Sequence, residues 1–163
     1  MGAMNNQDFG FRTIISEHPD GSFTIHSEDD YFDNYLAALE VKKSGDLHKA
    51  AQMLKISCEP PSIYKGHYAE VLRIFRALNK QDLKNGCYQD VIDRVNLALR
   101  YDDEMITELS RHWGSVHGNT YEKSYFARES NILISDIKSL LKASTAINDE
   151  ENIKKANYLI ANW

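Results

Sequence analysis

At two places in the chain, an otherwise helical pattern is interrupted by a glycine: Gly45 and Gly86. At the first place, the helical spacing of apolar residues ends at the glycine, and Asp46 then caps a new run that begins at Leu47. The residues around the two breaks align at a constant offset of 41 residues (Gly45 to Gly86). A repeated pair of helices joined by a tight turn predicts a stack of helical hairpins, a solenoid. The aligned pairs are Gly45 with Gly86, Ala50 with Val91, Leu54 with Val95, and Ser57 with Ala98.

The whole chain is expected to be mainly α-helical, with about six helices judged from the apolar spacing. Acidic residues near helix starts, lysines near helix ends, and Pro61 in a first turn set the expected boundaries. The final helix is expected to bury one face that includes Trp163, so that the C-terminus docks on the protein. The expected helical segments are residues 27–44, 47–58, 62–84, 87–104, 104–113, 121–144 and 150–162, the last capped by Asn148 and Asp149.

The N-terminal region has a different pattern from the helical part. Two β-rich runs, Phe11–Ser16 and Ser22–His26, flank a Pro-Asp-Gly turn signal, which predicts a β-hairpin over residues 11–26. Residues 1–10 are polar and are expected to form a disordered tail, with a vector-derived remnant before a native start at Met4. The expected organisation is therefore a tail at 1–10, a hairpin at 11–26, helical hairpins at 27–112, and a C-terminal helical pair at 121–163 packed on them.

The two helical hairpins resemble the tetratricopeptide repeat (TPR), over about residues 31–104. The resemblance implies a helical solenoid that acts by binding other proteins, with the first helix of each pair lining a concave face. The chain departs from the family in its offset, which is longer than the family's unit of about 34 residues, and in Asn79 and Val91, where small residues are usual. An ordinary helical bundle with two similar hairpins stays open as the alternative. The matching residues are Ala38, the turn Lys43–Asp46, Ala50, Leu54 and Ser57, then Leu78, Gly86, Tyr88, Val95, Ala98, Leu99 and Asp102.

The sequence contains no motif that predicts catalysis, a metal or a cofactor. His112 and His117 are five residues apart, whereas a metal-binding pair on a helix needs a spacing of about four. No glycine-rich phosphate loop follows a strand, and no nucleophile elbow is present. Cys58 and Cys87 fall in expected helical regions, which favours free thiols in a reducing cytoplasm. We therefore expect a protein that is not an enzyme and needs no cofactor.

The charge of the chain constrains its partners. The net charge is −5, which argues against general nucleic-acid binding, and no apolar run approaches the roughly 18 residues that span a bilayer. No signal-peptide pattern is present, so the expected location is the cytoplasm. A homodimer through the aromatic residues of the C-terminal region stays open, although core packing explains them equally well; these residues are Trp113, Tyr121, Tyr125 and Phe126.

One local charge pattern runs against the acidic total. Four basic residues at spacings of three, four and four would form a single stripe on the helix expected at 62–84. We therefore expect an adaptor that binds an acidic peptide or partner protein through a basic, aromatic-lined concave face. Two alternatives remain: a nucleic-acid-associated regulator whose stripe contacts phosphates, and a merely solvated helix face. The expected binding residues are Phe32, Tyr35, Leu39, Lys42, Lys43, Arg73, Arg76, Lys80 and Lys84.

Overall fold

The computed structural model describes residues 5–8, 13–17, 19–21, 23–27, 29–58, 65–117 and 130–163, and side chains within 19–21, 34–58, 65–111 and 130–163. The described part is mainly helical, as the sequence predicted, and has six helices. The helices are α1 (Asp29–Lys43), α2 (Leu47–Cys58), α3 (Lys65–Asn85), α4 (Tyr88–His117), α5 (Ile134–Ala146) and α6 (Glu150–Ala161).

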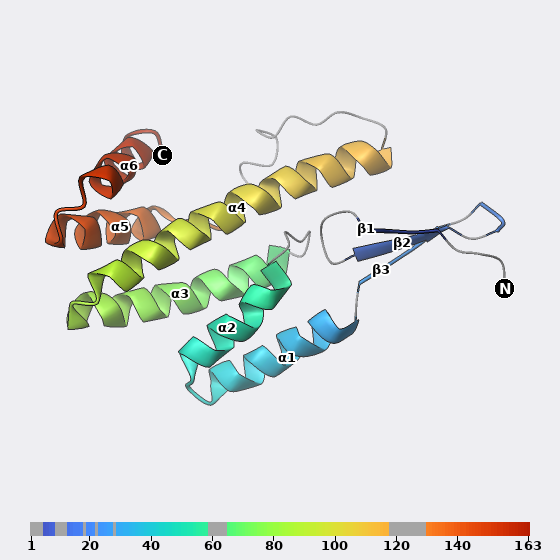
Figure 1. Cartoon of the computed structure of the whole chain (residues 1–163), viewed down its shortest axis with the longest axis horizontal. Coiled ribbons are helices and arrows are strands. Elements are labelled where there is room, and N and C mark those ends of the chain that lie inside the picture. Colours follow the sequence, from blue (N-terminus) through green and yellow to red (C-terminus); the bar gives the residue numbers. More distant parts are fainter. Residues whose placement is uncertain are drawn as a thin grey trace.

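The helices pack on one another in chain order (Figure 1). Helix α1 lies against α2, α2 against α3, and so on to α5 against α6, and α3 also touches α5 directly. The core consists of the apolar sides of these helices. The three aligned pairs that follow the glycines are buried in both copies, from Ala50 and Val91 to Ser57 and Ala98. The same positions of α2 and α4 therefore supply the packing surface.

The two glycine breaks lie where the sequence placed them. Gly45 has a φ of +97° and Gly86 a φ of +74°, a left-handed conformation that glycine adopts without a steric penalty. After the first break, the Asp46 carboxylate accepts a hydrogen bond of 3.1 Å from the backbone N–H of Lys49 and so caps α2. Asp149 caps α6 in the same way, by accepting from the backbone N–H of Asn152 at 3.2 Å.

Two predicted boundaries in the second half were wrong. The segments 87–104 and 104–113 form one helix of 30 residues, α4, because buried Tyr101 and Met105 carry the apolar spacing through Asp102. The helix expected at 121–144 begins at Ile134 as far as the structure describes it, because residues 130–133 are not helical. Residues 118–129, with three of the four proposed dimer aromatics, lie outside the described residues, as does the side chain of Trp113.

The predicted docking of the C-terminal tryptophan was also wrong. Helix α6 buries Ala156 and partly buries Leu159 and Ile160 against the core. Trp163 follows the end of the helix and keeps 60% of its surface exposed, and Tyr158 keeps 68%. The buried face of α6, which packs on α5, is therefore narrower than the sequence pattern predicted, and it does not include Trp163.

Three short strands precede the helices. They are β1 (Asn5–Asp8), β2 (Thr13–Glu17) and β3 (Phe23–Ser27), and they form an antiparallel sheet in the order β1-β2-β3. Ile15 of β2 pairs with Gln7 of β1 and with Ile25 of β3. The predicted hairpin at 11–26 includes residues outside the described ones, so as a whole it stays a prediction. No strand was expected within residues 1–10, where β1 lies.

Candidate functional site

The basic stripe of α3 is divided between structural ion pairs and unpaired lysines. Arg73 and Arg76 both contact carboxylates of the protein itself. Lys80 and Lys84 are exposed, and no carboxylate among the described residues pairs with either of them. The stripe is therefore not one continuous binding surface. Its arginines form ion pairs within the protein, and its lysines remain available to a ligand.

Glu70 pairs with Arg73, the first residue of the stripe, and links α1 to α3. Its side chain is only 8% exposed, and it contacts the ammonium of Lys42 on α1 through Oε1. Its second oxygen, Oε2, accepts a hydrogen bond of 2.9 Å from Nη1 of Arg73. Burial by itself raises the pKa of Glu70, but the hydrogen bonds from Lys42 and Arg73 outweigh it and lower the pKa below 4.5. Lys42 and Arg73 thus share one buried carboxylate, which compensates one of their two charges.

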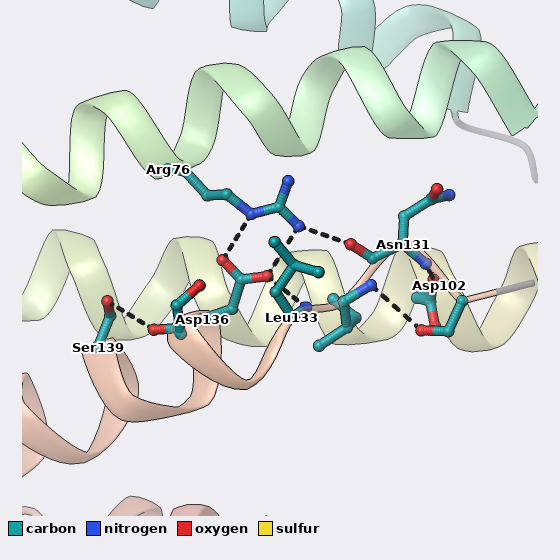
Figure 2. A network of polar contacts seen from close by, with 9 residues as sticks. Arg76, Asp102, Asn131, Leu133, Asp136 and Ser139 are labelled. Atoms are coloured by element: carbon teal, nitrogen blue, oxygen red, sulfur yellow. Dashed lines mark hydrogen bonds and ion pairs between the residues drawn. The ribbon is translucent and has the colours of Figure 1, made fainter. Parts of the chain in front are cut away.

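Arg76 connects α3 to α5 in the same manner (Figure 2). Its Nε donates to Oδ1 of Asp136 at 2.9 Å, and its Nη2 donates to Oδ2 at 2.9 Å. The same Nη2 also donates to the backbone carbonyl of Asn131 at 2.6 Å. Oδ2 of Asp136 accepts a further bond of 2.9 Å from the backbone N–H of Leu133, just before α5 begins. The guanidinium of Arg76, which was expected to bind a partner, is therefore bonded within the protein.

A pocket of about 340 Å³ lies beside this ion pair, between α3 and α5. Its lysines are Lys80 and Lys84 of α3 and Lys142 of α5, all three exposed at the surface. Because Arg76 and Asp136 neutralise each other, these three ammonium groups are the uncompensated charges of the lining. We call this site the lysine pocket; it is lined by Arg76, Asn79, Lys80, Leu83, Lys84, Ser135, Asp136, Ser139 and Lys142.

The predicted residues on α1 are placed away from this pocket. The ring of Tyr35 stacks on buried His67 of α3, with ring centres 4.4 Å apart and planes 16° from parallel. Burial lowers the pKa of His67 below its ordinary value of 6.5. Lys43 pairs with exposed Glu40, Leu39 is half-buried, and the side chain of Phe32 lies outside the described residues. Of the nine predicted binding residues, the lysine pocket contains Arg76, Lys80 and Lys84.

Sequence reasoning missed the α5 side of the site. Ser135, Ser139 and Lys142 have spacings of four and three, so they share one face of α5. That spacing was visible in the sequence, but it does not reveal which helix α5 packs against. The pocket therefore depends on a tertiary contact, α3 against α5, that the sequence pattern does not contain.

The described residues contain no group of three His, Cys, Asp or Glu side chains that is able to hold a metal ion. The side chains of His112 and His117 lie outside those residues. Cys58 is buried and Cys87 is exposed, and neither forms a disulfide. Within the part of the chain that the structure describes, every helix is too short or too polar to cross a membrane.

Comparison with known proteins gives no relative from which to assign the site. No protein-family model, no curated protein and no solved structure matches this chain.

Proposed function

We propose that this chain is a non-enzymatic, TPR-like adaptor of the cytoplasm that binds an acidic segment of a partner protein. The binding surface is the side shared by α1, α3 and α5, and the lysine pocket is its main determinant. The observation that carries the proposal is the cluster of three uncompensated lysines in a chain with a net charge of −5. A local charge opposite to the total attracts partners of matching sign to one place on the surface.

Three features support a repeat architecture. The helices pack in chain order, the two left-handed glycines lie at the aligned positions, and the aligned core residues are buried in both copies. Ion pairs connect α1 to α3 and α3 to α5, which holds these three helices in a fixed relation along one side. A rigid surface of this kind binds a peptide without first having to be ordered.

The binding surface differs from the one that the sequence suggested. Arg73 and Arg76 are both engaged in ion pairs within the protein, and loss of Arg76 would destabilise it, so substituting them does not test binding alone. Lys80, Lys84 and Lys142 are exposed and lack ion-pair partners among the described residues, so their substitution tests binding directly.

The test is a direct titration with a fluorescein-labelled, glutamate-rich peptide, followed by fluorescence anisotropy. The pocket variant is Lys80→Ala/Lys84→Ala/Lys142→Ala. The matched control is Lys49→Ala/Lys138→Ala/Lys154→Ala, which removes the same charge from exposed lysines outside the pocket. We expect the pocket variant to bind at least about tenfold more weakly, since three charge-assisted contacts are lost, and the control to bind as the wild type does.

Two results would count against the proposal. Equal weakening in both variants would mean that the peptide responds only to total charge. Tight binding of a single-stranded RNA oligonucleotide, with an affinity that falls steeply with salt and no binding of the peptide, would favour a nucleic-acid regulator instead.

A further inference from the structure

We infer that the lysine pocket takes a phosphorylated side chain of the partner, in preference to a carboxylate. This inference rests on the proposed function and names the group that the same site recognises. Three observations support it. The unpaired cations of the pocket are lysines, the Asp136 carboxylate is already bonded to Arg76, and the cavity is larger than a phosphate ion.

The free cations of the pocket are all lysines. Arg76 is the only arginine in the lining, and its Nε and Nη2 are held by Asp136 and Asn131. A planar guanidinium fork suits the two oxygens of a carboxylate, whereas ammonium groups act as separate point charges. Lys80, Lys84 and Lys142 come from two helices and surround one cavity. Three separate cations from two directions match a phosphate monoester, which presents three acceptor oxygens and a charge near −2.

The one carboxylate in the lining, that of Asp136, does not repel an anion strongly, because its charge is compensated. Oδ1 of Asp136 accepts from Arg76, and Oδ2 accepts from both Arg76 and the backbone N–H of Leu133. The charge of this carboxylate is therefore compensated on the protein side. An anion that enters the pocket meets the lysines as the groups that remain uncompensated.

The neutral lining groups also favour an acceptor-rich ligand. The hydroxyl of Ser139 donates to the backbone carbonyl of Ser135 at 3.0 Å. Among the described residues, no contact uses the hydroxyl of Ser135, so its proton remains as a donor. The side-chain oxygen of Asn79 accepts from Arg94 at 3.2 Å, which leaves the amide nitrogen of Asn79 as a second donor. The pocket thus offers donors to a group whose oxygens only accept.

The cavity indicates that the phosphate belongs to a larger ligand. Its volume of about 340 Å³ lies within the range of sites that enclose whole small molecules, so a phosphate ion would leave most of it empty. The three lysines are exposed, and exposed charges bind a small ion weakly on their own. A peptide can fill the remaining space and continue along the α3 surface. We therefore assign the phosphate to a side chain of a partner protein.

The experiment compares three degenerate peptide libraries of equal length, labelled with fluorescein and fixed at one central residue: phosphoserine, glutamate or serine. A degenerate library removes dependence on an unknown partner sequence. Fluorescence anisotropy is measured with the wild type, the pocket variant and the matched lysine control, after circular dichroism has shown equal helicity and equal thermal midpoints. We expect the phosphoserine library to bind about tenfold tighter than the glutamate library. We expect this preference to vanish in the pocket variant and to persist in the control.

The outcomes separate this inference from the proposed function. Equal binding of the phosphoserine and glutamate libraries would overturn the phosphate preference and leave the acidic-segment adaptor standing. Absence of binding by both libraries would overturn both proposals. Inorganic phosphate that competes at the same concentration as the phosphoserine library would show that the occupant is a free phosphate and would overturn the assignment to a partner protein. The same preference in the pocket variant would show that the phosphate binds elsewhere.

Discussion

The guanidinium of Arg76 and the carboxylate of Asp136 form two parallel hydrogen bonds of 2.9 Å each, across 60 residues of sequence. This pair joins α3 to α5, two helices that touch each other directly and that both pack on α4. The side chain of Asp136 is only 8% exposed, so its charge depends on Arg76 for compensation. The same carboxylate also accepts from Leu133 at the start of α5. The pair therefore fixes both the position of α5 and the place where it begins.

Replacing Arg76 by alanine should destabilise the protein. The change leaves a buried carboxylate without its cation, and we expect a loss of about 2–3 kcal/mol in the free energy of unfolding. Urea denaturation followed by circular dichroism measures it. Arg73→Ala is the matched control, because Arg73 is 64% exposed and Glu70 keeps Lys42; this change should cost less than about 1 kcal/mol. Equal losses in the two variants would contradict the structural role given to Arg76.

Buried His67 should make the protein less stable in mild acid. Its pKa is lowered in the folded state because burial penalises the imidazolium, so the unfolded chain binds the proton more readily. The stability contributed by neutral His67 is complete above pH 6.5, declines as the pH falls below that value, and levels off below the folded-state pKa. Thermal midpoints measured across this window should fall with decreasing pH.

A phenylalanine at this position provides the comparison. His67→Phe retains the stacking on Tyr35 but cannot take up a proton, so its thermal midpoint should vary less between pH 7 and about pH 5. His48→Gln serves as a control for an exposed histidine and should keep the wild-type pH dependence. If His67→Phe follows the wild-type curve, another group is responsible for the acid sensitivity.

Asp102 should hold the segment that leads into α5. Its buried carboxylate accepts from the Ser130 hydroxyl at 2.6 Å and from the backbone N–H of Asn131 at 2.8 Å. We expect Asp102→Ala to lower the free energy of unfolding by about 2 kcal/mol and to speed hydrogen exchange at the Asn131 amide. Ser130→Ala removes one of the two bonds and should cost about 1 kcal/mol or less. Unchanged exchange at Asn131 in Asp102→Ala would show that other contacts hold this segment.

Replacing Gly86 by alanine should destabilise the protein through backbone strain, without a steric clash. At a φ of +74° an alanine is strained, although its Cβ would lie 3.9 Å from the ring of Tyr88, an ordinary distance. We expect a loss of about 1 kcal/mol in chemical denaturation. Gly66→Ala is the opposite case, because Gly66 lies in α3 with open space around it and no positive φ. That change should be neutral or stabilising by up to about 1 kcal/mol.

The parts of the fold that the sequence predicted well depend on signals within a few residues. The break at Gly45, the cap at Asp46 and the cap at Asp149 need only local backbone geometry and one side chain. The α-helical class follows from apolar spacing, which is also local. These elements were predictable because no distant residue takes part in them.

Asp102 shows where local signals fail. Two acidic residues in succession suggested a helix boundary, but Asp102 is buried and bonded to residues 130 and 131. Its partners lie 28 and 29 residues further along the chain, so no local rule identifies them. The Asp102 carboxylate does not end the helix; it binds residues 130 and 131, which lead into α5.

The candidate site was predictable in part for the same reason. The spacing of Lys80 and Lys84 placed them on one face of α3, and both line the pocket. Glu70, three residues before Arg73, was visible as a neutralising partner, but the stripe was interpreted from its basic residues alone. Asp136 and Lys142 belong to another helix, so their roles required the packing of α5 on α3.

Packing in chain order also bears on how quickly the protein reaches its native state. Most helix–helix contacts join neighbours along the chain, so each new contact closes only a short loop, and low contact order is associated with rapid folding. The bonds of Arg76 to Asp136 and of Asn96 to Asn152 span 60 and 56 residues, and they require three or more helices to be in place. A folding chain would thus form its apolar interfaces early and close these polar links last.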